Sequence, residues 1–160
     1  MDELIPYSGG GNTNRVLPVI RYAEILLNLA EAANETGNTN LAMQQLYTIR
    51  DRAGIPAGAD GSFGFPSNPS KDEARELIRK ERFVELAFEG KRFWDIKRWK
   101  AASMIDGKYS QGMQITKTGS TYTYSKVNLQ LLNFKDNLYL FPIPQGEISA
   151  NLGILQNPGW

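Results

Sequence analysis

The sequence of 160 residues contains neither cysteine nor histidine. Without cysteine there are no disulfides and no thiol nucleophiles, and without both residues there are no Cys/His zinc sites. Mechanisms that use imidazole as a general base are excluded as well. Any catalysis would therefore depend on carboxylates, lysine, serine or tyrosine, and no cofactor is expected.

Long hydrophobic runs and a large net charge are also missing. No segment approaches the roughly 20 apolar residues that a transmembrane helix requires. The formal net charge of +1 gives no indication of a nucleic acid or an anionic membrane surface as a partner. Residues 1–6 have no basic region and no apolar stretch, so we expect no signal peptide there. Such a protein either stays in the cytoplasm or is a fragment without its targeting signal.

The chain is long enough for one domain with a hydrophobic core. Residues 1–17 are expected to form a flexible lead-in or linker, and residues 18–160 the folded domain. The glycine-rich stretch 8–12 could cradle a phosphate only in front of a helix. Pro18 and a run of apolar residues follow it instead, which favours the linker.

Apolar residues at helical spacing predict four helices, at about residues 18–36, 39–53, 71–88 and 91–102. Pro18 suits a first helical position, and Gly37 suits the end of the first helix. Ser70 and Glu73 form a capping box in front of the third helix. That helix is expected to bury an apolar stripe made of Leu77, Ile78, Phe83, Val84, Leu86, Ala87 and Phe88.

A turn of about three residues joins the first two helices, so they must pack side by side and antiparallel. Two helical hairpins in succession are typical of an α-solenoid, and Gly37 and Ala42 are small residues that suit a tetratricopeptide-like pair. Residues 113–116 and 121–124 alternate around a turn and predict a small β-hairpin. The fold is therefore expected to be mainly α, an α-solenoid scaffold of tetratricopeptide-like helical hairpins with one β-hairpin and an extended C-terminal tail.

The glutamates Glu81, Glu85 and Glu89 share one helix face because they are four residues apart. Their carboxylates could be the acid and the nucleophile of a glycosidase, or ligands in a metal site. They could also belong to an ion-pair network between helices, which we favour, because buried charges persist only when they are paired. In that network the expected partners of Glu81, Glu85 and Asp95 are Arg82, Arg92 and Arg98.

The aromatic residues divide into two groups. Trp94 and Trp99 could stack on a sugar or a base, but they lie at helical spacing with other apolar residues, so we expect them to pack in the core or between helices. Loop and hairpin segments that are poor in charge hold the candidates for stacking on a ligand, which are Phe63, Tyr109, Tyr122 and Tyr124. The tyrosines could instead be those of an ordinary exposed hairpin.

Three segments, read in order, resemble one known family. They are residues 21–32, residues 78–99 with the sequence Glu89-Gly90-Lys91-Arg92-Phe93-Trp94-Asp95, and residues 140–160 with Leu140-Phe141-Pro142-Ile143-Pro144. Together they resemble the C-terminal part of the SusD/RagB family, whose members are outer-membrane lipoproteins of Bacteroidetes that capture glycans and other nutrients. The resemblance covers about residues 15–160.

The resemblance implies a largely helical protein that binds an oligosaccharide or another nutrient without catalysis. Family members are surface-exposed through a lipid on an N-terminal cysteine and are partners of a SusC-like TonB-dependent transporter. This chain lacks that cysteine, so attachment to the membrane would require a lipid anchor outside it. The resemblance also implies a structural role for the Glu/Arg/Trp motif, because the motif is family-wide whereas ligand preference varies. The alternative function is a tetratricopeptide-type adaptor for a protein partner.

Overall fold

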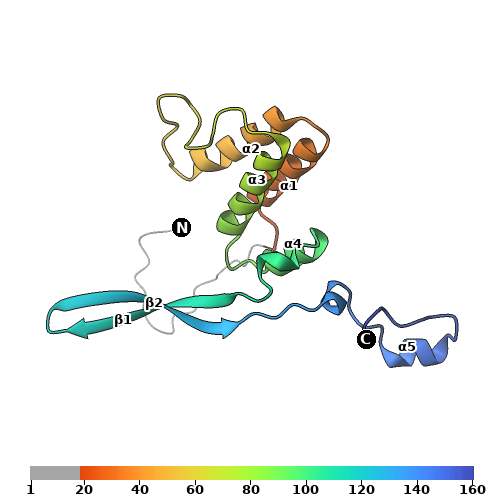
Figure 1. The fold of residues 1–160 in the computed structure, drawn as a ribbon. Coiled ribbons are helices and arrows are strands. Elements are labelled where there is room, and N and C mark those ends of the chain that lie inside the picture. Colours follow the sequence, from red (N-terminus) through yellow and green to blue (C-terminus); the bar gives the residue numbers. More distant parts are fainter. Residues whose placement is uncertain (1–18) are drawn as a thin grey trace, which may run out of the picture. The chain divides into compact units, whose positions relative to one another are not determined.

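The computed structural model describes residues 19–160, and the linker expected at residues 1–17 lies outside them (Figure 1). The chain divides into two compact units, one ending at Glu89 and one spanning Gly90–Trp160. Helices predominate, and the only sheet among the described residues is a two-stranded antiparallel hairpin. The predicted fold class is therefore confirmed. None of the helices in residues 19–160 has the length and apolarity needed to span a bilayer.

The first unit is built from α1 (Tyr22–Glu35), α2 (Thr39–Arg52) and α3 (Lys71–Glu85). Both α2 and α3 pack against α1, as Figure 1 shows. The core between them contains Leu26, Leu27, Ala30, Ala33, Ala42, Met43, Leu46, Ile49, Phe65, Ala74, Ile78 and Leu86. Ala30 and Ala42 are completely buried in it, as expected where two helices of a tetratricopeptide-like pair approach closely.

Local capping fixes the turn between α1 and α2 and the start of α3. Gly37 adopts φ +91 directly after α1, and Asn38 accepts a hydrogen bond from the Leu41 amide as the N-cap of α2. The predicted capping box is present, because Ser70 Oγ accepts from the Glu73 amide at 3.3 Å. The Glu73 carboxylate in turn accepts from the Ser70 amide at 2.8 Å, which lowers the pKa of Glu73.

The predicted start of α1 is wrong by about four residues. The helix begins at Tyr22, because Arg21 has extended backbone angles (φ −115, ψ 154) and serves as its N-cap. Pro18, the expected first residue, lies outside the described residues. Proline is compatible with the first position of a helix, but its presence does not mean that a helix begins there.

The predicted end and buried stripe of α3 are also partly wrong. The helix ends at Glu85 rather than Phe88, and Phe88 adopts φ +63. Phe83, Val84 and Phe88 are exposed (56%, 63% and 108%), whereas Glu81 and Arg82 take places in the buried face. At about 100° per residue, Phe83 and Val84 point roughly 140° and 120° away from buried Ile78, so one face cannot hold all three.

The second unit begins with α4 (Lys91–Arg98), which ends four residues earlier than predicted. Lys100 adopts φ +49 after it, and a short 3-10 helix, η1 (Ala102–Met104), follows. A second 3-10 helix, η2 (Asp136–Tyr139), returns to this region. A small core formed by Ile96, Ala102 and Phe134 holds these elements together, and the Tyr139 hydroxyl accepts a hydrogen bond from the Ala102 amide at 3.0 Å.

The hairpin is longer than predicted, with β1 at Tyr109–Thr118 and β2 at Thr121–Leu131. Thr118 pairs with Thr121, so the connection is a two-residue loop of Gly119 and Ser120, with Gly119 at φ +62. A β-bulge lies near the base, because Ser110 pairs with Gln130 and Gln111 with Asn128. Leu129 is the extra residue of the bulge.

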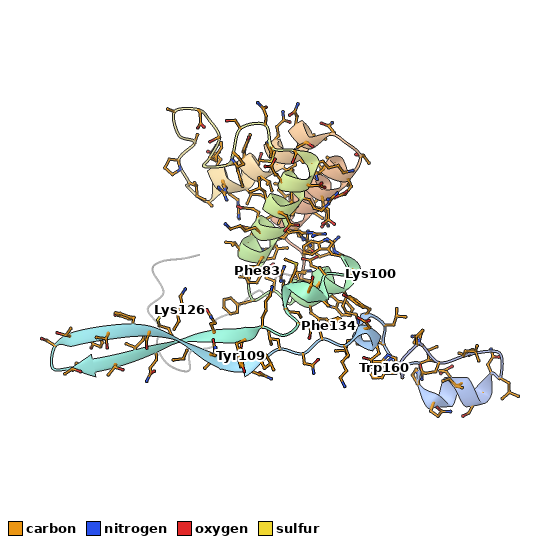
Figure 2. The ribbon with its side chains drawn as sticks, in the orientation of Figure 1. Phe83, Lys100, Tyr109, Lys126, Phe134 and Trp160 are labelled. Atoms are coloured by element: carbon orange, nitrogen blue, oxygen red, sulfur yellow. The ribbon has the colours of Figure 1, made fainter. Side chains whose placement is uncertain are left out.

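The tail contains α5 (Gln145–Ala150) and then returns to residues 137–143. The Gln156 amide makes a pair of hydrogen bonds with the Ile143 backbone, accepting at 2.8 Å and donating at 2.9 Å. Trp160 Nε1 donates to the carbonyls of Asn137 and Leu140 at 3.0 and 3.2 Å. We call these contacts the tail clasp (Figure 2).

Candidate binding surface

Strand register places the three hairpin tyrosines on one face. In β2, Tyr122 and Tyr124 are two residues apart and so point to the same side. Their partners across the hairpin are Lys117 and Ile115. Lys117 Nζ lies 5.5 Å from the centre of the Tyr122 ring, within the range of a cation–π contact.

The bulge at Leu129 extends this face to the base of the hairpin. Tyr109 pairs with Leu131, whereas a regular ladder beginning at the Gln111–Asn128 pair would bring Gln130 opposite Tyr109. The extra residue shifts the alternation of β2 by one, so Leu131 joins Tyr109 on the side of Tyr122 and Tyr124. We call this side the tyrosine face. Its members are Tyr109, Gln111, Met113, Ile115, Lys117, Tyr122, Tyr124, Lys126, Asn128 and Leu131.

The tyrosine face is rich in aromatic side chains and open to solvent. Tyr109, Tyr122 and Tyr124 are 51%, 50% and 65% exposed. Figure 2 marks Tyr109 at the start of β1 and Lys126 on β2. The opposite face carries mainly hydroxyl and amide side chains, with Leu129 lying over Gly112. The hairpin thus presents one aromatic and one polar side.

Phe63, the fourth residue predicted to stack on a ligand, has a different environment. It lies in the loop between α2 and α3 of the first unit and stacks on Tyr47, with ring centres 5.6 Å apart. Its ring is partly buried against the core, and its carbonyl accepts from Arg50 Nη1 at 2.7 Å. Phe63 is therefore a packing residue of the first unit, whereas the tyrosines are exposed in the second.

An ion-pair network joins the end of α3 to the first two helices. Arg21 Nη1 lies 2.8 Å from the Glu85 carboxylate, and Arg21 Nη2 lies 2.6 Å from that of Glu89. Arg52 approaches the same Glu85 oxygen at 2.5 Å. The hydrogen bonds that Arg21 donates to Glu89, which has the larger effect, and to Glu85 raise the pKa of Arg21 above its ordinary value. Two guanidinium groups thus neutralise the two carboxylates.

Glu81 forms an ion pair with an arginine of α2. Arg50 Nη2 lies 2.9 Å from its carboxylate, and the same guanidinium stacks 3.5 Å above the Phe65 ring. Of the arginines named from the sequence, Arg98 pairs with Asp95 at 2.9 Å, and Arg82 donates to Asn28 at 2.7 Å. The third, Arg92, contacts the sulfur of Met104. Sequence spacing did not indicate Arg21, Arg50 or Arg52, because they lie 31 to 68 residues from the glutamates.

The contacts of the three glutamates can be compared with the three roles considered for them, which are glycosidase catalysis, metal binding and ion pairing. Each of Glu81, Glu85 and Glu89 accepts from at least one guanidinium. Within residues 19–160, no group of three or more acidic side chains is placed to hold a metal ion. The carboxylates are therefore engaged in joining helices, which is the role that the ion-pair interpretation assigns to them.

The tryptophans do not both pack as expected. Trp94 is 56% exposed, and its ring lies 5.8 Å from that of Phe141. Lys97 Nζ sits 3.7 Å from the centre of the Phe141 ring and 5.1 Å from that of Phe93. The expectation of a buried Trp94 is wrong, because its contacts are surface aromatic and cation–π contacts. Trp99 is partly buried and lies beneath the Arg98 guanidinium.

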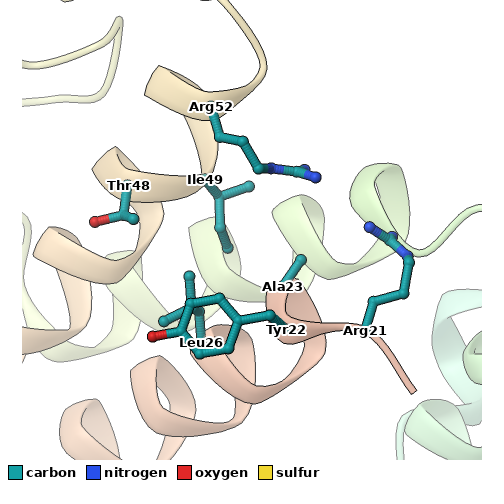
Figure 3. Close-up of a pocket in the computed structure, with 7 residues that line it drawn as sticks. All are labelled: Arg21, Tyr22, Ala23, Leu26, Thr48, Ile49 and Arg52. Atoms are coloured by element: carbon teal, nitrogen blue, oxygen red, sulfur yellow. The ribbon is translucent and has the colours of Figure 1, made fainter. Parts of the chain in front are cut away.

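A pocket of about 320 Å³ lies between α1 and α2 and was not predicted from the sequence (Figure 3). Its lining includes the apolar side chains of Ala23, Leu26 and Ile49 and the ring of Tyr22. The remaining lining residues are Arg21, Thr48 and Arg52. The lining residues at the start of α1 are at least 22 positions from those in α2. No local motif could therefore have revealed the pocket.

Comparisons with known proteins agree on one family. A model described as the SusD family matches residues 6–160. SusD-like protein P2 of Formosa agariphila is 32% identical over 156 residues, which are 96% of this chain and 27% of that protein. SusD-like protein P38 of the same species is 36% identical over 97 residues, which are 60% of this chain and 19% of that protein.

Solved structures give the same result. The crystal structure of a SusD-like protein from Bacteroides fragilis matches with a TM-score of 0.72 at 34% identity, over 89% of this chain and 25% of that one. A SusD homolog from Bacteroides thetaiotaomicron matches with a TM-score of 0.61 at 32% identity, over 88% of this chain and 26% of that one. The chain thus spans about a quarter of the length of P2 and of these two structures.

Proposed function

The chain belongs to the SusD family, and from this premise we propose that it serves in the non-catalytic capture of oligosaccharides or other nutrients at the bacterial outer membrane. Family membership confirms the resemblance seen in residues 21–32, 78–99 and 140–160. The proposal extends to a SusC-like TonB-dependent transporter as the partner and to surface exposure through a lipid anchor. Both rest on the resemblance to the family.

The observation that carries the proposed binding role is the tyrosine face. Three tyrosines that are about half exposed share one side of the hairpin with Met113 and Ile115. Aromatic rings offer flat apolar surfaces with a hydroxyl at one end, which suits ligands that are apolar on one face and polar at their edges. A pyranose ring has this character, because its C–H groups gather on its faces and its hydroxyls on its rim.

A non-catalytic role is consistent with the state of the carboxylates. Glu85 and Glu89 share Arg21, and Glu81 is held by Arg50. A glycosidase needs two carboxylates that face a substrate, one as acid and one as nucleophile or base. Here the carboxylates contact guanidinium groups that cross-link helices, so we propose that they stabilise the scaffold.

The test is an oligosaccharide-binding titration of the full chain against a panel of neutral and acidic oligosaccharides. Changing Tyr109, Tyr122 and Tyr124 to alanine together should abolish binding to whichever sugar the chain takes. Thr123→Ala, on the opposite face of β2, is the matched control and should leave affinity unchanged. Equal affinity of the triple variant and the unaltered chain would reject the tyrosine face as the binding surface.

A second function is favoured by the pocket between α1 and α2. Tyr22, which lines the pocket, is 74% exposed, and Ile25 and Leu29 continue an exposed apolar stripe along α1. We propose as the alternative a tetratricopeptide-type adaptor that receives an apolar side chain of a peptide in this pocket. Capture of a peptide by the chain, lost in Ala23→Trp but retained in the triple tyrosine variant, would favour the adaptor.

A further inference from the structure

The charges of the hairpin lie on one of its faces. Residues 109–131 contain two lysines and no aspartate or glutamate. Lys117 is on β1 and Lys126 on β2, and both belong to the tyrosine face. The opposite face carries no charged side chain at all. The aromatic surface is therefore also the positively charged surface of the hairpin.

The two lysines bracket the aromatic centre of this face. Lys117 is paired with Tyr122, and Lys126 is paired with Met113. The pair of Ile115 and Tyr124 lies between them. Four residues along a strand separate the two lysine-containing pairs, which is about 13 Å. A ligand that covers Tyr124 thus meets an ammonium group on each side.

The proposed ligand is an oligosaccharide, and the positive charge of the tyrosine face indicates which kind of oligosaccharide it prefers. We propose that the tyrosine face prefers an oligosaccharide that carries carboxylate groups, a uronic-acid oligomer, over a neutral one; this rests on the proposed capture function. Sugar rings pack on the tyrosines, and carboxylates on neighbouring units contact Lys117 and Lys126. With no acidic side chain on the hairpin, nothing there repels the ligand or competes for the lysines.

Lys117 is favourably placed for such a contact. Its ammonium lies 5.5 Å from the centre of the Tyr122 ring, so the side chain extends over the aromatic surface. A cation held near a ring keeps its remaining hydrogen-bond donors for an anion. Exposed ion pairs are weak singly, so each lysine should change affinity about two- to fivefold, and the preference should weaken as salt rises.

The experiment compares one sugar backbone in two charge states. A hexameric oligogalacturonate and its fully methyl-esterified form are titrated into the full chain by calorimetry, in low salt and again at about 0.5 M salt, where the Debye length is only a few ångströms. The acid form should bind several-fold more tightly in low salt, and the difference should shrink at high salt.

Variants assign the preference to the two lysines. Lys117→Gln and Lys126→Gln together should weaken binding of the acid form about four- to twenty-fivefold and leave the ester unchanged. Lys135→Gln, an exposed lysine outside the hairpin, removes the same charge and should change neither affinity. Circular dichroism of each variant checks that the fold is retained.

The outcomes separate this inference from the proposed function. Equal affinity for the acid and the ester, or a preference that survives the double lysine variant, overturns the charge preference while oligosaccharide capture stands. Absence of binding to every oligosaccharide tested, by a chain with intact circular dichroism, overturns oligosaccharide capture itself and this inference with it. Loss of acid-form binding in the double variant with the ester unchanged supports the inference.

Discussion

Arg21 contacts Glu85 twice, donating from Nη1 to its carboxylate at 2.8 Å and from Nη2 to its backbone carbonyl at 2.7 Å. The two residues are 64 positions apart, so this contact ties the start of α1 to the end of α3. Arg21→Ala would leave that carbonyl and the Glu89 carboxylate without their donor. We expect it to lower the free energy of unfolding by about 1–3 kcal/mol, seen as a melting temperature several degrees lower.

Arg52→Ala provides the matched comparison. Arg52 contacts the same Glu85 oxygen at 2.5 Å, but its side chain is 56% exposed against 24% for Arg21. Exposed pairs contribute at most about 1 kcal/mol, so the loss should be smaller. If the two variants melt at the same temperature, the backbone contact made by Arg21 contributes nothing measurable.

Asn34 is a fully buried polar residue that joins three helices. Its side-chain nitrogen donates to the Lys71 carbonyl at 2.8 Å, and its oxygen accepts from Thr39 Oγ1 at 3.0 Å. Asn34→Ala should reduce stability by about 1–3 kcal/mol, because both partners lose their hydrogen bonds. Thermal denaturation measures this, and Asn40→Ala, an exposed asparagine in α2, should leave the melting temperature nearly unchanged.

Glu35 makes the fold sensitive to acid. Arg75 donates from Nε and Nη2 to its two carboxylate oxygens at 2.5 and 2.8 Å, which lowers the pKa of Glu35 from 4.5 to about 2. Because the folded pKa is the lower one, the ionised carboxylate stabilises the fold above about pH 4.5. That contribution is lost as the pH falls from there towards about 2.

The variant Glu35→Gln should therefore lose less stability than the unaltered chain between about pH 5 and pH 3. Melting temperatures across this range measure the effect. Arg75→Gln removes the same interaction, so the double variant should show no further reduction in acid sensitivity. An additive double variant would mean that Glu35 and Arg75 act independently.

The tail clasp should be visible in amide hydrogen exchange. The Ile143 amide donates to the Gln156 side chain at 2.8 Å, so Gln156→Ala should accelerate its exchange. Gln156→Glu retains an acceptor and should preserve more protection at Ile143. The Leu132 amide, which donates to the Lys108 carbonyl at 2.8 Å, is an internal reference that neither variant should change.

The sequence predicted those parts of the structure that depend on contacts between residues close together in the chain. The capping box of Ser70 and Glu73 and the helix after Asn38 follow from side chains that bond to the nearest turn. The hairpin follows from alternation around Gly119. Its full length was not predicted, because residues 109–112 lack a strict alternation of apolar and polar residues, and two consecutive polar residues, Ser125 and Lys126, separate the alternation at 121–124 from that at 127–131.

The features that the sequence did not predict depend on contacts between residues that are far apart in the chain. Spacing placed Glu81 and Glu85 on one helix face, but the arginines that hold them from α1 and α2 depend on how three helices pack. Phe88 at φ +63 is a conformation that aromatic residues rarely adopt, so a continuing helix was the reasonable expectation. Which residues make up the tyrosine face depends on the pairing register of β1 and β2, which the bulge at Leu129 shifts by one.

That bulge has a consequence for how the hairpin can diversify. Deleting Leu129 would restore a regular ladder and leave Ser110 paired with Gln130 and Tyr109 with Leu131, because the bulge already accommodates this one extra residue. Loss of this residue is therefore a one-residue change that keeps both sides of the hairpin, whereas a one-residue insertion or deletion in β2 that no bulge accommodates exchanges the two sides below it. The loop of Gly119 and Ser120 is free of this restriction. Relatives that take different ligands could then vary the tip, and could lose the bulged residue, without changing which side chains share the tyrosine face.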